Sequence, residues 1–258
     1  MKKLKISITG CLGRMGTQLI KTAKKNKHLQ IESVTERKTA KKKKIRNLEI
    51  LKNSLSAFKD TSVIIDFTTP NCTIEVLKIA KQLRKKIVIG TTGFSPKQEK
   101  YIKNISKFIP VLKAGNMSLG INVLIYLAEL TSKSLGSKYL IKIVEEHHKH
   151  KKDYPSGTAL MLGDVAAKGR GKSLKKIMGK KTLNKNNLPF GKKINFGSKR
   201  KGEIVGNHSV LFSNNMEVIN LTHNAYDRSL YSEGALHAAQ WLTKKRPGYY
   251  SMRDVLNI

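Results

Sequence analysis

The chain has 258 residues, which is enough to bury a sizeable core in one large domain or two moderate ones. Only 39% of the residues are hydrophobic, but they come in short blocks such as "SVIIDF" and "KIVIG", which favours a folded enzyme over a disordered chain. The 51 Lys and Arg residues against 17 Asp and Glu residues give a net charge of +34. The lysines are spread along the chain without interleaved aromatic residues, which argues against specific nucleic-acid binding.

The first third of the chain alternates apolar strands with helical patterns, as βαβ units do. Strands are predicted at residues 5–9, 31–36, 62–67 and 86–92, and helices at 14–25 and 71–85, with a short helical piece near "LEILKNSLSAF" (48–58). The almost continuously apolar strands indicate burial on both faces. The pattern therefore predicts an α/β fold with a parallel sheet.

The pattern changes around "KAGNMSLGIN" (113–122). A helix is predicted at 121–134, a strand that turns polar at 139–151, a helix preceded by a loop at 155–169, two strands joined by an "NN" turn at 203–213 and 216–225, and a helix at 233–245. The stretch 172–200 is rich in Lys, Asn and Gly, and is predicted to be the most loop-like part of the chain. The adjacent strands predict an antiparallel or mixed sheet in this second region.

No unbroken apolar run is longer than 123–128, far short of the roughly 20 residues that a membrane helix needs. Polar residues interrupt any signal-peptide core near the N-terminus. Cys11 and Cys72 are too few for a disulfide framework and form no Cys-x-x-Cys pair, so we expect both to be reduced and to serve as small buried fillers. These features predict a soluble cytoplasmic protein with no membrane partner.

A glycine-rich loop, "GCLGRMG" (10–16), follows the first predicted strand and precedes a predicted helix. In the usual Gly-x-Gly-x-x-Gly fingerprint, such a turn brings a pyrophosphate to free backbone N–H groups at a helix N-terminus. Gly13 and Gly16 keep the last spacing of that fingerprint, whereas Cys11 occupies the place of a glycine. The loop alone is compatible with phosphate binding and with a plain strand-to-helix turn.

Two charged residues, Glu36 and Arg37, end the second predicted strand about 20 residues after this loop. Glu36 can accept hydrogen bonds from an adenosine ribose, and Arg37 can hold a 2′-phosphate, so both NADH and NADPH are compatible with the pair. The alternative is an ordinary solvated pair at a strand end. The small residues of "GTTGF" (90–94) follow another strand, where they can approach a nicotinamide ribose or form a simple turn.

The block "EEHHKHKKDYPSGTAL" (145–160) concentrates histidines and lysines just before a predicted helix. A metal site is one interpretation, but no Cys or carboxylate ligands stand at a diagnostic spacing, and we expect no metal. A solvated polar loop is the second. The third is an active site for an anionic substrate, because cations orient carboxylates, a helix N-terminus offers donors, and His and Lys transfer protons.

This block and others resemble the 4-hydroxy-tetrahydrodipicolinate reductase (dihydrodipicolinate reductase) family of bacterial lysine biosynthesis. The resemblance runs nearly end to end and includes "GCLGRMG", Glu36-Arg37, "DFTTP", "GTTGF", "GNMSLGIN", "GEIVGNHSV", "LTHNAYDR" and "MRDVL". It implies a Rossmann-like, doubly wound parallel sheet that binds the cofactor in residues 1–118 and 229–258. It also implies an α+β domain with a mixed sheet in residues 119–228, which binds substrate and forms a homotetramer.

The resemblance also implies roles for individual residues. Those expected to contact NADH or NADPH are Gly10, Cys11, Leu12, Gly13, Arg14, Met15, Glu36, Arg37, Gly90, Thr91, Thr92, Ala114, Gly115, Asn116 and Met117. The expected proton donors are His147 and Lys151. A cyclic dicarboxylate is expected to be held by His148, Lys151, Ser156, Gly157, Thr158 and Arg228. The implied reaction reduces 4-hydroxy-tetrahydrodipicolinate to tetrahydrodipicolinate with NAD(P)H and releases water.

Two other functions are compatible with parts of the sequence. One is a nonenzymatic polyanion-binding protein on a Rossmann-like fold, which the charge of +34 would suit. The other is an NAD(P)-dependent reductase of the aspartate dehydrogenase type, against which residues 147–158 argue. The segment "RKTAKKKKIRNLEI" (37–50) is short and basic for the family, and Met117 stands where an aromatic residue is frequent, so the cofactor preference is open.

Overall fold

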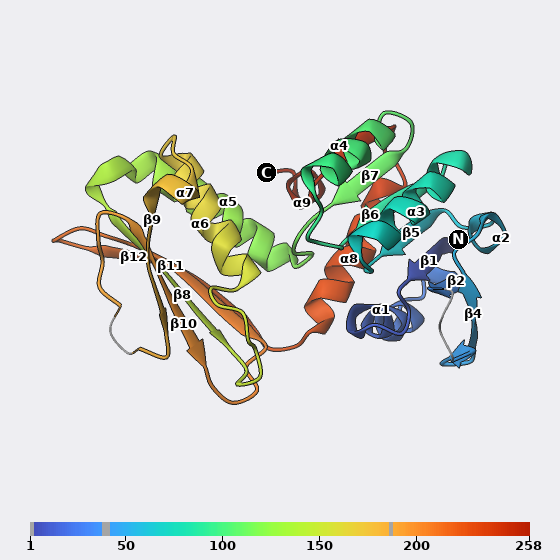
Figure 1. Ribbon diagram of the computed structural model, residues 1–258, viewed down its shortest axis with the longest axis horizontal. Coiled ribbons are helices and arrows are strands. Elements are labelled where there is room, and N and C mark those ends of the chain that lie inside the picture. The colour runs from blue at the N-terminus through green and yellow to red at the C-terminus, as the bar shows by residue number, and fades with distance from the viewer. Residues whose placement is uncertain (1–2, 38–41, 186–187) are drawn as a thin grey trace. The chain divides into compact units, whose positions relative to one another are not determined.

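Two β-sheets organise the chain, and each belongs to a separate unit of the computed structural model. The structure describes residues 3–37, 42–185 and 188–258. The first unit comprises Met1–Leu119 and Ser229–Asn257, and the second comprises Gly120–Arg228 together with Ile258. The C-terminal helices therefore belong to the unit in which the chain begins (Figure 1).

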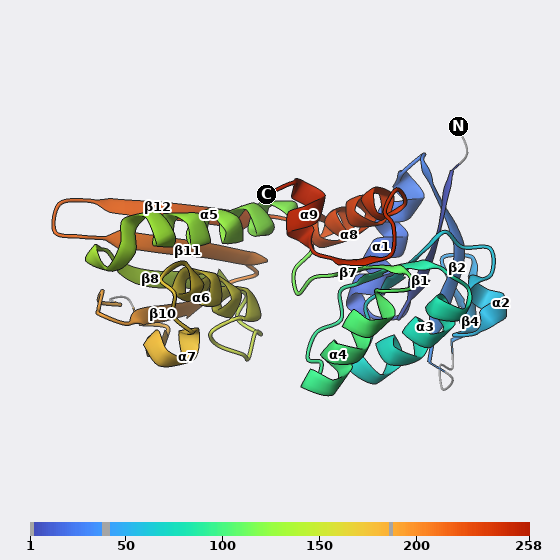
Figure 2. The ribbon, with the colours of Figure 1, turned by 90° about the horizontal axis from the view of Figure 1, so that it is seen from above.

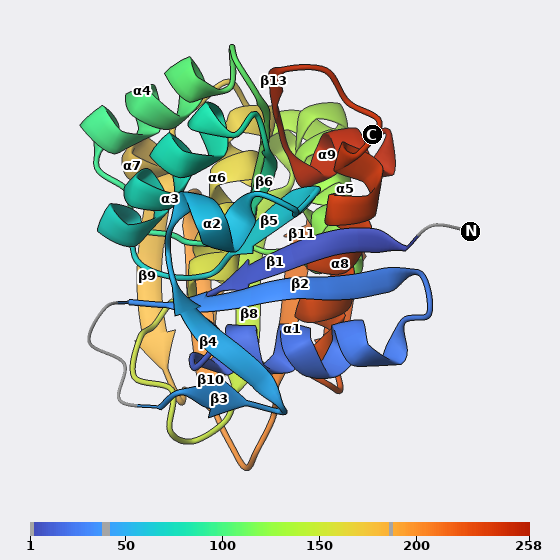
Figure 3. The same ribbon diagram turned by 90° about the vertical axis from the view of Figure 1, so that its right-hand side faces the viewer.

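The first unit is built on a mostly parallel sheet. Its strands are β1 (Leu4–Thr9), β2 (Leu29–Glu36), β3 (Lys44–Ile45), β4 (Leu48–Lys52), β5 (Val63–Asp66), β6 (Lys86–Ile89), β7 (Pro110–Lys113) and β13 (Gly248–Tyr250). Their order is β13-β7-β6-β5-β1-β2-β4-β3, and only β3 and β4 pair in antiparallel fashion. The chain winds outward from β1 in both directions, with β2 on one side and β5 on the other (Figure 3). In such sheets ligands bind at the carboxyl edge, where the winding reverses.

Helices cover both faces of this sheet. They are α1 (Arg14–Lys25), α2 (Leu55–Phe58), α3 (Pro70–Gln82), α4 (Pro96–Ile105), α8 (Ser229–Leu242) and α9 (Met252–Leu256). Figure 1 shows α1 and α8 on one face, and α3 and α4 on the other. Ile64 and Ile65, neighbours in β5, are both fully buried and belong to different core clusters. Burial on both faces accounts for the continuous apolar runs in the sequence.

The second unit carries a mixed sheet. Its elements are α5 (Leu119–Leu135), a 3-10 turn (Gly136–Lys138), β8 (Leu140–His147), α6 (Gly157–Gly169), α7 (Leu174–Ile177), β9 (Met178–Leu183), β10 (Ile194–Arg200), β11 (Gly206–Ser213) and β12 (Val218–Ala225). The strand order is β12-β11-β8-β10-β9, with parallel pairing from β8 to β9 and antiparallel pairing from β8 to β12 (Figure 2). Apolar side chains of α5 and α6 pack on this sheet in one core cluster. The predicted fold class is confirmed.

Strand β8 leads from the core to polar residues. Its residues alternate between half-buried and buried, and Ile141, Ile143, Glu145 and His147 occupy the buried positions. Because side chains alternate between faces along a strand, these four lie on one face of the sheet. The two isoleucines belong to the hydrophobic core. Glu145 and His147 therefore occupy the last two buried positions on the same face of the sheet, at the end of the strand.

One secondary-structure prediction is confirmed only in part, and another is wrong. The short helical piece predicted near 48–58 is present at residues 55–58 as α2, whereas residues 48–52 form strand β4, because they pair in parallel with β2 while Leu48 and Ile50 pack on the core. The stretch 172–200 is not mainly loop, since it contains α7, β9 and β10, and the first five residues of β10 are buried between β8 and β9. Residues 186–187 of this stretch, and residues 38–41 of the basic segment 37–50, lie outside the described residues. Among the described helices, none is long and apolar enough to cross a membrane.

Candidate functional site

The glycine-rich loop after β1 has a backbone that favours glycine. Gly10 has a φ of +67°, and a Cβ atom there would lie 2.7 Å from the carbonyl oxygen of Phe67. A Cβ atom at Gly16, in the first turn of α1, would lie 2.1 Å from the carbonyl oxygen of Gly10. Helix α1 therefore starts directly against the loop, with Gly13 as its N-cap. The first N–H groups of a helix have no intrahelical partner, so this turn offers donors suited to a phosphate.

Glu36, at the end of β2, holds the loop from the neighbouring strand. Its carboxylate accepts hydrogen bonds from the N–H groups of Leu12 (3.1 Å) and Arg37 (3.0 Å). A carboxylate has about four acceptor positions, so Glu36 can also bind a ribose hydroxyl, with the exposed Arg37 beside it. Cys11 is buried under the loop, and burial raises the pKa of its thiol to about 11. Cys72, the other free cysteine, is only half-buried.

A buried carboxylate joins three strand ends at this edge. Asp66, the last residue of β5, is fully buried and accepts hydrogen bonds from four threonine hydroxyl groups. The donors are Thr9 in β1, Thr68 after β5, Thr73 in α3 and Thr91 after β6. Burial raises the pKa of Asp66, and these hydrogen bonds offset part of the rise. Because Thr9 precedes Gly10 and Thr91 follows Gly90, Asp66 anchors both glycine-containing loops.

The remaining residues predicted to contact the cofactor follow β6 and β7. A Cβ atom at Gly90 would lie 2.1 Å from the ring of Phe67, so the glycine lets this ring pack on the backbone. Met117 is buried, and the side-chain oxygen of Asn116 accepts a hydrogen bond from the N–H group of Ser118. The structure thus brings residues 10–15, 36–37, 90–92 and 114–117 to the carboxyl edge of one sheet.

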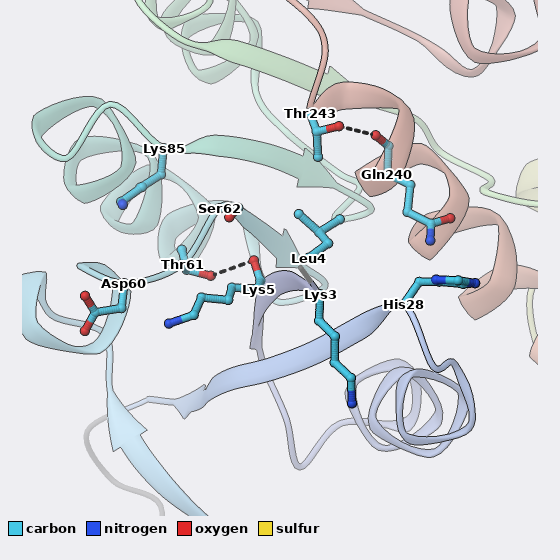
Figure 4. A pocket seen from close by; sticks show the side chains of 10 residues that line it. All are labelled: Lys3, Leu4, Lys5, His28, Asp60, Thr61, Ser62, Lys85, Gln240 and Thr243. Carbon is cyan, nitrogen blue, oxygen red and sulfur yellow. Dashed lines mark hydrogen bonds between the residues drawn. The ribbon is translucent and has the colours of Figure 1, made fainter. Parts of the chain in front are cut away.

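A pocket of about 810 Å³ lies at the opposite edge of this sheet (Figure 4). Leu4, at the start of β1, and Lys85, just before β6, are among its lining residues. Lys5, which also lines it, forms an ion pair with Glu32, and Lys85 donates to a backbone carbonyl oxygen. None of the residues predicted to contact the cofactor lines this pocket.

In the second unit, a buried carboxylate occupies the centre of the predicted substrate site. The side chain of Glu145 is 1% exposed. It accepts hydrogen bonds from the N–H group of Ser156 (3.2 Å) and from both terminal nitrogens of Arg200 (2.9 Å each), and it pairs with Nδ1 of His147. Burial alone would raise the pKa of Glu145, but the hydrogen bonds from His147 and Arg200 lower it to about 2.

Arg200, at the end of β10, connects this carboxylate to the loop after β8. Its side chain is 6% exposed, and it donates to the backbone carbonyl oxygens of Lys151 (3.2 Å), Asp153 (2.7 Å) and Lys199 (2.7 Å). The ammonium of Lys151 pairs with the carboxylate of Asp153 at 2.8 Å. The charge of Arg200 is therefore buried against Glu145.

Two further residues, His208 and Gly206, lie next to the ring of His147. The ring of His208 meets it edge to face, with centroids 5.0 Å apart, and burial lowers the pKa of His208 to about 3. His208 also shares a hydrogen bond of 3.1 Å with the hydroxyl of Ser156, which is the N-cap of α6 and accepts from the N–H group of Ala159. A Cβ atom at Gly206 would lie 3.0 Å from Nε2 of His147, so the glycine leaves space beside that nitrogen.

The other predicted substrate residues lie around this network. Gly157 and Thr158 begin α6, and a Cβ atom at Gly157 would meet no atom within 4 Å, so its backbone is open to a ligand. His148 and Arg228 lie close enough to interact, since burial and the charge of Arg228 lower the pKa of His148. Within the part of the chain that the structure describes, no group of three or more His, Cys, Asp or Glu residues is placed to hold a metal ion.

The sequence predictions did not include Asp66, Glu145, Arg200 and His208. One local signal could have identified Glu145, which stands two residues before His147 on a strand and so shares its face. The other three gain their importance from partners that are distant in the sequence, and no spacing pattern marks them.

The first unit is a doubly wound sheet with a glycine-rich loop at its switch point, and the second unit gathers histidines, a buried carboxylate and cationic side chains. This combination is typical of two-domain nicotinamide-dependent reductases. Two family models narrow this class. The model described as "Dihydrodipicolinate reductase, N-terminus" matches residues 4–117, and the model described as "Dihydrodipicolinate reductase, C-terminus" matches residues 120–256. The chain belongs to the dihydrodipicolinate reductase family.

Individual relatives agree with this membership. The chain is 61% identical over 257 residues to the 4-hydroxy-tetrahydrodipicolinate reductase of Pelagibacter ubique, covering 100% of this chain and 99% of the relative. It is 41% identical over 267 residues to the protein of the same name from Buchnera aphidicola, covering 98% and 97%. A dipicolinate-bound dihydrodipicolinate reductase from a Paenisporosarcina species matches the fold with a TM-score of 0.78 and 20% identity, over 96% of this chain and 97% of that chain.

The pKa of Glu145 predicts how the protein responds to acid. Because this pKa is lowered from 4.5 to about 2, ionised Glu145 stabilises the folded state above pH 4.5, and the contribution is lost as the pH falls towards 2. A shift of this size corresponds to roughly 3 kcal/mol. We expect the free energy of unfolding, measured with urea at several pH values, to fall more steeply across this range in the wild type than in Glu145→Gln. Equal slopes would contradict the pKa assignment.

Proposed function

We propose that the chain catalyses the NAD(P)H-dependent reduction of 4-hydroxy-tetrahydrodipicolinate to tetrahydrodipicolinate, with loss of water. As a member of the dihydrodipicolinate reductase family, it is an oxidoreductase of the diaminopimelate route to lysine. The observation that carries this assignment is the 61% identity over the full length of a relative with that name. The site geometry supplies roles for the residues.

The first unit holds the cofactor in this proposal. The loop at 10–16 and the N-terminus of α1 receive the pyrophosphate, and residues 90–92 and 114–117 line the same sheet edge. Glu36 suits a free ribose 2′-hydroxyl and Arg37 suits a 2′-phosphate, so this edge is compatible with NADH and with NADPH. When bound, the nicotinamide supplies the hydride.

The second unit holds the cyclic dicarboxylate and supplies a proton. The carboxylates bind to cations and to donors at the N-terminus of α6. These groups belong to His148, Lys151, Ser156, Gly157, Thr158 and Arg228. Loss of the 4-hydroxyl group as water leaves a ring carbon that is conjugated with the imine of the substrate. Addition of a hydride to that carbon leaves an electron-rich enamine, and His147 or Lys151 protonates it. One hydride and one proton enter the substrate, and one water leaves it.

A coupled assay tests the reaction with freshly made 4-hydroxy-tetrahydrodipicolinate and each cofactor in turn. We expect both NADH and NADPH to be oxidised in a substrate-dependent manner, and pyridine-2,6-dicarboxylate to inhibit the reaction. No oxidation of either cofactor by the folded protein would overturn the proposal. Binding of DNA with a steep salt dependence, in the absence of cofactor binding, would favour the polyanion-binding alternative.

Removal of the proton donors should slow the chemical step. We expect His147→Ala and Lys151→Ala to lower kcat by about 10²- to 10⁴-fold, the usual contribution of general acid catalysis. The dissociation constant for NAD(P)H should stay unchanged, because both residues belong to the second unit. Lys152→Ala is the matched control, since Lys152 is an exposed neighbour in the same loop. Near-wild-type turnover by both variants would show that neither residue delivers the proton.

A substitution in the glycine-rich loop should weaken binding of the cofactor and leave binding of the substrate analogue unchanged. A Cβ atom at Gly13 would already lie 3.2 Å from the carbonyl oxygen of Gly10, and a valine would also fill the space before the first turn of α1. We expect Gly13→Val to weaken NAD(P)H binding by about tenfold or more, a loss of roughly 1.4 kcal/mol. Fluorescence titration measures the effect, and binding of pyridine-2,6-dicarboxylate serves as the control for the second unit. An unchanged NAD(P)H titration would remove the loop from the site.

We also propose that the enzyme is a cytoplasmic homotetramer assembled through the second unit. Strand β12 lies at a sheet edge with alternate residues exposed. Its first residue, Val218, is 55% exposed, and Met216, in the turn before it, is 89% exposed. Proteins normally cover such edges and apolar groups. The free cysteines and the reducing cofactor suit the cytoplasm. Light scattering should give four times the chain mass of 28.9 kDa, and a monomer mass would contradict the assembly.

A further inference from the structure

We propose that the buried ion pair between Glu145 and Arg200 positions both proton donors of the site, orienting His147 through the carboxylate and the loop of Lys151 through the guanidinium. This inference rests on the proposed function, because it takes those two residues as the donors. Glu145 and Arg200 are 1% and 6% exposed, which is too little for contact with a substrate. Both are therefore positioning residues.

The carboxylate determines which nitrogen of His147 faces the substrate. An ionised carboxylate only accepts hydrogen bonds, so Nδ1 of His147, which pairs with Glu145, must carry a proton. Nε2 makes no hydrogen bond within the described residues and lies beside the space left by Gly206. The ring of His208 packs edge to face against this ring and favours the observed orientation. The proton that His147 exchanges with a substrate is therefore the one on Nε2.

The guanidinium holds the loop that carries Lys151. Arg200 donates from Nε to the carbonyl oxygen of Lys151, and from a terminal nitrogen to that of Asp153. A guanidinium is planar and rigid, so these bonds and the two bonds to Glu145 have fixed relative directions. The backbone of Lys151 is thus fixed relative to the carboxylate that orients His147. One ion pair sets the relative placement of the two donors.

The position of the pair argues for a role beyond stability. A buried ion pair recovers its desolvation cost only with good geometry, and apolar replacements are often as stable. The two buried positions of β8 that precede Glu145 carry Ile141 and Ile143, so an apolar side chain would also fit at position 145. Hydrogen bonds have preferred directions that apolar contacts lack, and directional contacts are what the orientation of a ring and a loop requires.

The first test compares Glu145→Gln with Glu146→Gln, its neighbour on the other face of β8. Glu146 is half-buried and forms a long ion pair of 3.9 Å with Lys199. Glutamine keeps the shape of the side chain but replaces one acceptor oxygen with an NH2 group, so it cannot satisfy His147 and Arg200 together. We expect kcat to fall about 10- to 100-fold in Glu145→Gln, and less than about twofold in Glu146→Gln. The dissociation constant for NAD(P)H should not change in either variant.

A double-mutant cycle separates positioning from a general loss of structure. If Glu145 acts through His147, the combined loss of kcat in Glu145→Gln/His147→Ala should be much smaller than the product of the two single losses. We expect the same non-additive loss of kcat for Arg200→Lys combined with Lys151→Ala, because lysine keeps the positive charge but lacks the planar guanidinium group. Losses that multiply fully in both cycles would overturn the positioning role.

A further variant keeps the test valid if Glu145→Gln fails to fold. That substitution leaves the charge of Arg200 buried without its partner, which is strongly destabilising. Glu145→Gln/Arg200→Met removes both charges, and its melting temperature should approach that of the wild type. We expect this folded variant to have the same low kcat as Glu145→Gln, because its proton donors are no longer held in position. A wild-type kcat in it would overturn the proposal.

Failure of this inference is distinguishable from failure of the proposed function. If the wild type does not oxidise NAD(P)H with the substrate, the proposed function fails. If His147→Ala and Lys151→Ala both turn over normally, the assignment of the donors fails. If these two variants are inactive while folded Glu145→Gln and Arg200→Lys are fully active, only the positioning role is overturned.

Discussion

The arrangement of strands and loops in the second unit depends on the hydrogen bonds that one buried carboxylate, Glu145, requires. An ionised carboxylate that leaves water requires hydrogen bonds in place of its hydration shell. Glu145 receives them from His147 in its own strand, from the N-cap residue Ser156, and from Arg200. The ends of β8 and β10 and the start of α6 therefore meet at one point. The candidate proton donors and, apart from Arg228, the candidate substrate-binding groups are carried by these elements and by the loop between β8 and α6.

The first unit follows the same principle with different donors. Asp66 is also buried at a strand end, but four threonine hydroxyl groups surround it instead of an arginine and a histidine. Neutral donors leave the pKa of Asp66 raised by burial, whereas Arg200 and His147 lower the pKa of Glu145. In both units a buried carboxylate gathers strand ends that are distant in the sequence and places the loops between them.

Signals that are contiguous in the sequence predicted much of this arrangement. The loop at 10–16, the helix at 14–25 and the polar end of β8 are each visible as a motif or a period. The residue that neutralises Glu145 cannot be recognised in this way, because Arg200 is 55 residues away. It also lies in a stretch whose Gly, Ser and Lys content is typical of a loop. Gly197 and Ser198 are instead buried in the middle of a sheet. A local pattern shows which residues share a face, but not which distant strand faces them.

In the proposed site, Glu145 fixes the proton of His147 on Nδ1 and leaves Nε2 to exchange a proton with the substrate. Nitrogen NMR of the full chain, labelled at histidine and assigned with His147→Ala, measures both ring nitrogens as the pH is varied. We expect Nδ1 to stay protonated at every pH at which the protein is folded, and only Nε2 to change its protonation. A neutral ring that carries its proton on Nε2, or titration of Nδ1, would contradict it.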